Sequence, residues 1–168
     1  MEKSITYVGL DVHKNTIDVA LADGGRNDEV RHYGTINSDM GSLDKLVRKL
    51  VSQSREPRFV YEAGPCGYEI YRHLTRQGYE CVVVAPSLIP RKSGDRIKND
   101  RRDSMMLARL HRAGELTPVY VPHSEDEAMR DLCRAREDAK RAERKARQQL
   151  NAFLLRNGYR YTGRSSWS

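Results

Sequence analysis

The sequence predicts an α/β domain with a mixed five-stranded sheet, followed by a long coiled-coil helix. Apolar runs typical of strands alternate with helical apolar stripes in the order β-β-β-α-β-α-β, and a further helix follows. The residues from Glu125 to about Asn157 include neither Gly nor Pro, which suits one uninterrupted helix. Four acidic residues, Asp11, Glu62, Asp100 and Asp103, stand within or at the end of apolar runs and at the start of a helix.

The first apolar run, from Tyr7 to Val12, is almost unbroken and suits a central strand that is buried on both faces. Asn15 and the segment Asp23-Gly24-Gly25 are turn signals, so the first three strands are expected to form an antiparallel meander. Strands are expected at residues 7–12, 17–22, 30–36, 58–62 and 80–85. Helices are expected at residues 40–51, 68 to about 78, 100–113 and 125–157.

Capping and turn residues set these bounds. Asn37 or Ser38 is the expected N-cap of the first helix, and Pro57 is expected to separate that helix from the fourth strand. The segment Gly64–Gly67 predicts a turn, and the second helix is expected to end near Gly78.

The stretch from Pro86 to Asn99 is basic and is expected to be an exposed loop. The helix that follows is expected to bury Met106, Leu107 and Leu110 on its inner face. An antiparallel meander joined in this order to parallel crossovers is the ribonuclease-H-like pattern. A generic α/β domain needs no carboxylate inside its first strand, where Asp11 is costly to bury unless it is paired or metal-bound.

The four acidic residues predict a metal site. Asp100 and Asp103 are three residues apart and therefore point from one helix face. Together with Asp11 and Glu62 they are expected to bind Mg²⁺ or Mn²⁺, because these ions prefer oxygen ligands and no thiolate or imidazole cluster indicates zinc. Two such ions can activate a nucleophile and stabilise the leaving oxygen of a phosphodiester. For the pair in the helix, the alternative is N-terminal capping and compensation of the helix dipole.

The chain is basic, with a net charge of +7 and a sequence pI near 9.4, which favours a polyanionic partner such as DNA. The alternative is that the surplus serves solubility. Seven basic residues near the acids are expected to hold phosphates, unless they form a merely solvated loop: Lys14, Arg91, Lys92, Arg96, Lys98, Arg101 and Arg102. His13 either touches the scissile phosphate or has a structural role in its turn, and no catalytic role is assigned to it.

The three cysteines form no zinc-binding pattern and are expected to be buried thiols in a reducing compartment. The sequence shows no signal peptide and no membrane-spanning run, so we expect a cytoplasmic protein without a membrane partner.

The long helix carries an apolar seam with a period near 3.5 residues, which is typical of a coiled coil. The seam consists of Ala128, Leu132, Ala135, Ala139, Ala142, Ala146, Leu150 and Phe153. Such a helix would extend roughly 45–50 Å, which is longer than a compact domain needs. We expect it to mediate dimerisation or to bridge domains; the alternative is that it lies on its own domain. Its basic stretch from Lys140 to Arg147 either follows a nucleic-acid backbone or solubilises the helix.

Three segments resemble a known family when they are taken together and in order. These are the segments 8–14, with the sequence VGLDVHK, 62–64, with EAG, and 98–108, with KNDRRDSMMLA. They look like the DEDD transposases of the insertion-sequence 110 family, which are relatives of the Piv DNA invertase and are understood as bridge-RNA-guided recombinases. The resemblance extends over nearly the whole chain, including the closing segment from Tyr161 to Trp167.

The resemblance implies that the family's catalytic tetrad falls on Asp11, Glu62, Asp100 and Asp103. It implies a RuvC-like domain at residues 1–122, a coiled-coil helix at 123–158, and a tail at 159–168 that leads to a second domain with a catalytic serine. None of the serines in the tail is assigned as that nucleophile. DNA, a guide RNA and a second copy of the chain are the implied partners.

Three functions are therefore open. The first is the nuclease-like half of an RNA-guided transposase, and the second is a non-catalytic module for nucleic-acid binding and dimerisation. The third is a fragment of an actin-like or sugar-kinase ATPase, which also begins with a strand, an aspartate and a hairpin. That third function predicts Gly-rich phosphate loops and two domains, and the sequence has neither.

Overall fold

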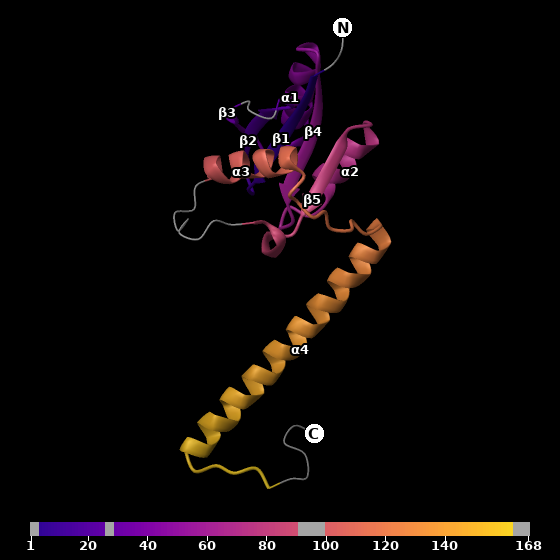
Figure 1. Cartoon of the computed structure of the whole chain (residues 1–168). Coiled ribbons are helices and arrows are strands. Elements are labelled where there is room, and N and C mark those ends of the chain that lie inside the picture. Colours follow the sequence, from indigo (N-terminus) through magenta and orange to yellow (C-terminus); the bar gives the residue numbers. More distant parts are fainter. Residues whose placement is uncertain (1–3, 26–28, 91–99, 163–168) are drawn as a thin grey trace. The chain divides into compact units, whose positions relative to one another are not determined.

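The computed structural model describes residues 4–25, 29–90 and 100–162 (Figure 1). The chain divides into two compact units, Met1–Val121 and Pro122–Ser168, and each is described by itself. The strands are β1 Ser4–Val12, β2 Thr16–Asp23, β3 Arg31–Asn37, β4 Arg55–Glu62 and β5 Glu80–Val84. The helices are α1 Met40–Ser52, α2 Glu69–Arg76, α3 Asp100–Ala113 and α4 Ser124–Arg156, with the short 3₁₀ helix η1 at Pro86–Leu88.

The first unit contains one five-stranded sheet in the order β3-β2-β1-β4-β5. Strands β1, β2 and β3 pair antiparallel, whereas β4 pairs parallel with both β1 and β5. β1 is therefore central, as its apolar run predicts. This topology confirms the mixed sheet and the ribonuclease-H-like α/β fold expected from the element order.

The two faces of the sheet bury different kinds of side chain, because neighbouring residues in a strand point to opposite faces. On one face, Val8 and Leu10 of β1 belong to the main core, to which α1 and α2 also contribute. On the other face, α3 packs on β1 and β2, where Ala20 and Ala22 contact a cluster that includes Ala108 (Figure 1). Small residues therefore line the part of the second face over β1 and β2, whereas Val60 of β4 and Val84 of β5 form an aliphatic cluster with Leu107 and Leu110 of α3.

Gly9 of β1 lies directly beneath α3. A Cβ atom at this position would come within 2.6 Å of the backbone nitrogen of Ala108 and closer still to the backbone oxygen of Ser104. Both α3 residues are fully buried. The absence of a side chain at Gly9 therefore allows the backbones of helix and strand to approach closely.

Three predicted details are wrong. Pro57 lies inside β4 and does not separate this strand from α1. Pairing of β4 with β5 begins only at Arg58, so β4 is an edge strand at Pro57. Proline has no backbone N–H, and an edge position tolerates that missing donor. The N-cap of α1 is Asp39, whose side chain accepts a hydrogen bond from the Ser42 N–H at 2.8 Å. Ile89, expected in an exposed loop, is buried in a second apolar cluster with Leu107.

The prediction for the helix at 100–113 is confirmed in its bounds, and Leu107 and Leu110 are buried on its inner face as expected. Met106 is half-buried, whereas Ser104 and Ala108 are buried instead, because the closest approach to the sheet selects small residues. The cysteines are free, but Cys133 on α4 is exposed and not buried as expected.

The second unit contains α4, a helix of 33 residues in which no residue is buried. Its exposed apolar side chains are Met129, Leu132, Leu150, Phe153 and Leu155. Within the described ranges, no helix has both the length and the apolar character needed to cross a membrane.

Candidate metal centre

A cavity of about 930 Å³ opens in the first unit where β1 and β4 end and α3 begins. Three of the four predicted carboxylates line it, namely those of Asp11, Glu62 and Asp103. β1 and β4 are parallel neighbours that pair up to Leu10 and Tyr61, so the next residue of each strand is one of these acids. The two carboxylates therefore meet at the same edge of the sheet.

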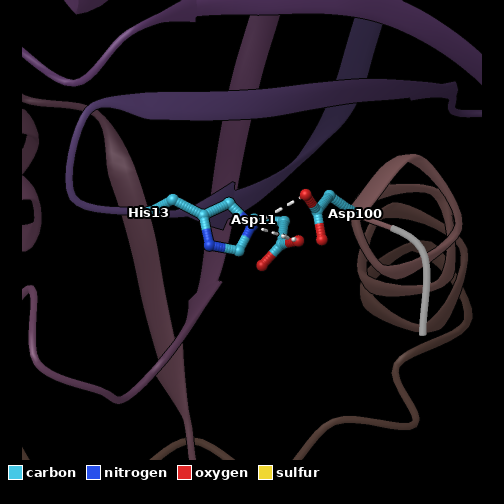
Figure 2. A group of neighbouring side chains, drawn as sticks. All are labelled: Asp11, His13 and Asp100. Atoms are coloured by element: carbon cyan, nitrogen blue, oxygen red, sulfur yellow. Dashed lines mark hydrogen bonds and ion pairs between the residues drawn. The ribbon is translucent and has the colours of Figure 1, made fainter.

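The fourth predicted carboxylate, Asp100, joins the site through His13 (Figure 2). The Nε2 atom of His13 lies 3.2 Å from Oδ2 of Asp11 and 3.4 Å from Oδ2 of Asp100. The donor atoms of these three residues lie close enough together to hold one metal ion. Figure 2 shows that one ring nitrogen of His13 contacts both carboxylates, which lie on the same side of the imidazole.

Local structure explains why the sequence brings these groups together. Gly9 and Asp11 point to the same face of β1, so the close contact of α3 at Gly9 holds the first turn of α3 beside Asp11. Asp100 and Asp103 occupy that first turn, where negative charge is favourable to the helix dipole. His13 is fixed by the turn between β1 and β2, in which its backbone N–H donates to the Thr16 carbonyl at 2.8 Å.

The turn that follows Glu62 is also anchored. Tyr61 is fully buried, and its hydroxyl donates a hydrogen bond of 3.0 Å to the carbonyl oxygen of Gly67. Because Tyr61 immediately precedes Glu62, this bond limits movement of the backbone on both sides of the carboxylate.

The electrostatics of the site favour a bound cation. Burial raises the pKa of the Asp11 carboxyl; His13 opposes that shift, and the negative charges of Asp103 and Asp100 raise the pKa further. The side chain of Asp11 is 15% exposed, so its repulsion by the other acids is weakly screened. A divalent ion among these groups would relieve the repulsion, and oxygen ligands of this kind suit Mg²⁺ and Mn²⁺. The residues present therefore fit a divalent metal.

The predicted basic residues are distributed unevenly. Lys14 and Arg102 line the cavity, whereas Arg101 is an exposed residue of α3 that is not among the lining side chains. The remaining four, Arg91, Lys92, Arg96 and Lys98, lie outside the described residues.

The sequence does not predict two polar contacts near the site. His13 is expected to touch the scissile phosphate or to have a structural role in its turn, and its contact with both Asp11 and Asp100 is the difference that the structure shows. Asp18 is paired with Asp11 in the register of β1 and β2, and its Oδ1 lies 3.0 Å from both His32 Nε2 and Thr35 Oγ1. An aspartate within the apolar second strand was the signal for that cluster.

Known proteins resemble this chain along most of its length. The sequence model of the IS110 DEDD family, described as transposase, matches residues 8–157. A protein of Sinorhizobium fredii (strain NBRC 101917 / NGR234) that carries a provisional name as transposase y4qE is 49% identical over 162 residues, which are 96% of this chain and 42% of that protein. The transposase for insertion sequence element IS1533 of Leptospira borgpetersenii is 37% identical over 155 residues, which are 92% of this chain and 44% of that protein.

Solved structures of RuvC from Thermus thermophilus also resemble the chain. One is in complex with a Holliday junction substrate and matches with a TM-score of 0.44 at 10% identity; the other matches with 0.45 at 12%. Each match covers 68% of this chain and 99% of the RuvC chain. The chain spans about two fifths of the length of the curated transposase relatives. On the family match and these identities, the chain belongs to the DEDD transposase family of the IS110 type.

Proposed function

We propose that this chain is the metal-binding, nuclease-like half of a DNA transposase, in which Asp11, Glu62, Asp100 and Asp103 hold Mg²⁺ or Mn²⁺ for DNA strand cleavage and exchange. The observation that carries the proposal is the cavity at the ends of β1 and β4, which Asp11, Glu62 and Asp103 line together. Family membership supports it, because the DEDD family is described as transposase.

The chain's own residues have separable tasks in this proposal. Asp11 stands on the central strand and its side chain is 15% exposed, against 50% for Asp100, so it fixes the position of the site. Glu62 of β4 and Asp103 of α3 line the same cavity. Lys14 and Arg102 line the same cavity and attract the phosphates of a DNA strand, which offsets their repulsion by the four acids. Bound divalent ions would supply Lewis-acid activation of a nucleophile and stabilisation of the leaving oxygen.

The finer features of the proposal rest on the family resemblance. The attacking group is a serine of a second domain, so these residues form the carboxylate half of a composite centre. A guide RNA selects the DNA target. Residues 1–122 are the catalytic domain, 123–158 the coiled-coil helix, and 159–168 the tail that leads to the second domain.

A second candidate function is favoured by the surface of α4. Met129, Leu132 and Phe153 are between 54% and 65% exposed, and an apolar seam of this kind is stabilised by a partner helix. The chain would then act as a non-catalytic module for nucleic-acid binding and dimerisation. In both candidate functions, α4 is proposed to mediate dimerisation.

Metal-dependent cleavage distinguishes the two functions. The chain is incubated with supercoiled plasmid and with branched DNA in Mn²⁺, alongside the Asp11→Asn variant. Nicking that Asp11→Asn abolishes supports the nuclease-like half. Asp44→Asn is the matched control, because Asp44 is likewise bonded to a histidine, His73 at 2.7 Å, but lies outside the cavity.

Binding without cleavage would support the second function. A crystal of the chain soaked in Mn²⁺ then decides whether the carboxylates hold metal at all. Anomalous peaks within about 2.1–2.3 Å of Asp11, Glu62 and one of the α3 acids are expected if the site is metal-binding. Carboxylates that point apart with no shared peak would contradict the catalytic assignment.

A further inference from the structure

The imidazole of His13 lines the cavity and has no task in the proposed function. Its Nε2 is the atom that faces both Asp11 and Asp100, at 3.2 and 3.4 Å (Figure 2). The side chain is 35% exposed and belongs to the lining of the cavity, so it reaches the site and remains accessible to an ion.

The separations between the donor atoms suit a shared ion. Neighbouring ligands of one ion at metal–ligand distances of 2.0–2.2 Å lie roughly 2.8–3.1 Å apart in the octahedral geometry that Mg²⁺ requires. The observed separations of 3.2 and 3.4 Å exceed this interval by at most about 0.3 Å, so a small movement of the side chains would allow them to share an ion. The alternative is a hydrogen bond from Nε2–H, but one N–H cannot point well at two carboxylates in different directions.

The backbone holds the imidazole in place. The His13 N–H is bonded to the Thr16 carbonyl, and Asp11 and Ile17 flank the turn in paired positions of β1 and β2. A ligand fixed in a tight hairpin loses little conformational entropy when it binds an ion.

We propose that His13 Nε2 is a ligand of the divalent cation held by Asp11 and Asp100, and that this imidazole gives the site a preference for Mn²⁺ over Mg²⁺. The inference rests on the proposed function, because it needs the carboxylates to bind metal. It adds a nitrogen donor to a set of oxygen donors. Imidazole suits transition metals, whereas Mg²⁺ prefers oxygen ligands and water.

The test is a binding and spectroscopic experiment on the 168-residue chain, with Mn²⁺ alone as the probe. Electron paramagnetic resonance measures Mn²⁺ affinity, competition with Mg²⁺ measures the preference, and pulsed experiments detect coupling of the manganese to nitrogen. The variants are His13→Asn and, as the matched control, His73→Asn. His73 also bonds an aspartate, Asp44, but lies on α2 outside the cavity.

We expect nitrogen coupling in the native chain and in His73→Asn, and its loss in His13→Asn. The Mn²⁺ affinity of His13→Asn should fall at least about tenfold, since the loss of even an outer-shell partner costs 10–100-fold. The Mg²⁺ affinity of His13→Asn should fall less than its Mn²⁺ affinity, so the ratio of the Mn²⁺ affinity to the Mg²⁺ affinity should decrease. Circular dichroism confirms that the variant folds.

Two results would overturn the inference, and they differ in what they leave standing. Manganese that binds through Asp11 without nitrogen coupling, and equally well in His13→Asn, would restrict His13 to a hydrogen bond but leave the carboxylate site intact. No Mn²⁺ binding by the native chain would overturn both the ligand role of His13 and the proposed metal centre.

Discussion

Gly9→Ala tests whether the contact between α3 and β1 positions the candidate site. The added Cβ would lie 2.6 Å from the backbone nitrogen of Ala108 and 3.2 Å from its Cα. These are backbone atoms inside a helix, so no side-chain rotation can relieve the overlap. The helix must move away from the sheet by about 1 Å to restore ordinary contact distances.

The magnitude follows from the packing. Overpacking a well-packed core costs about 1–3 kcal/mol in the free energy of unfolding, and the Tm of a chain of this size falls by about 2–4 °C for each kcal/mol. We therefore expect Gly9→Ala to lower Tm by roughly 2–12 °C. Metal sites tolerate distance errors of about 0.2 Å, so a 1 Å displacement of Asp100 and Asp103 should also weaken Mn²⁺ binding at least about tenfold.

The assay combines thermal unfolding with Mn²⁺ titration of the native chain, Gly9→Ala and Gly64→Ala. Gly64 lines the cavity and is therefore a control for Tm alone; the nearest heavy atom to an added Cβ there is the Glu62 carbonyl oxygen, at 4.0 Å. The control should leave Tm within about 1–2 °C of the native value, since a substitution without a clash changes stability little. If Gly9→Ala matches the control in Tm and the native chain in Mn²⁺ affinity, the positioning role of this contact is refuted.

Three further predictions concern pH, an ion pair and the long helix. Burial lowers the pKa of His111 below its ordinary 6.5. The contribution of the neutral imidazole to the free energy of unfolding is therefore fully present above about pH 6.5 and is lost as the pH drops toward the folded-state pKa. His111→Phe should reduce this loss of stability, measured as the difference in urea midpoint between pH 7.5 and 5.5. Arg55→Met should lower the free energy of unfolding by about 1–3 kcal/mol, measured by urea denaturation, because it leaves the Asp23 carboxylate without its Arg55 partner. Leu132→Glu combined with Leu150→Glu should convert the expected dimer of the native chain to a monomer in light scattering, because the two substitutions place charges in the α4 seam. The unfolding of the first unit should stay unchanged, because both side chains are exposed on α4.

Each of these has a contrary outcome. An acid loss of stability in His111→Phe equal to that of the native chain would place the titrating group elsewhere. An unchanged urea midpoint in Arg55→Met would mean that the ion pair contributes no net stability, as many exposed pairs do not. A monomeric native chain, or a dimer that persists in the doubly substituted helix, would contradict association through the α4 seam; Gln148→Glu with Asn151→Glu controls for the added charge.

The sheet could be predicted because its signals are local. The apolar run around Val8, the turn at Gly24 and the stripe around Leu46 each report one element, and the order of elements leaves few topologies. The bound of β4 could not be predicted in the same way. Pro57 is a strand breaker by local rules, and its position becomes acceptable because β5 begins to pair one residue later, which is a tertiary fact.

That Asp11, Glu62 and Asp103 line one cavity could be expected from sequence, whereas the contact of His13 with Asp11 and Asp100 could not. An acid such as Asp11 conflicts with an apolar strand, and that conflict is visible in sequence. His13 follows in a turn where a histidine conflicts with nothing, so its approach to Asp100, 87 positions further along the chain, is visible in the structure alone. The same holds for Asp18, whose partners His32 and Thr35 depend on the register of β3.

The interface between α3 and β1 links the site to residues that lie far from its chemistry. α3 runs antiparallel to β1. At one end of the pair, Asp100 lies near Asp11. At the other end, the rings of His111 and Tyr7 meet edge to face with their centroids 5.1 Å apart. Gly9 lies between these contacts, at a position where no side chain fits beneath α3. A packed interface of this kind does not deform gradually, because its side chains interlock. A change of size at Tyr7 should therefore tilt α3 about the contact at Gly9 and move Asp100 relative to Asp11. The geometry of the carboxylates is on this view a property of the whole strand and helix pair, which explains why small residues are found at its centre.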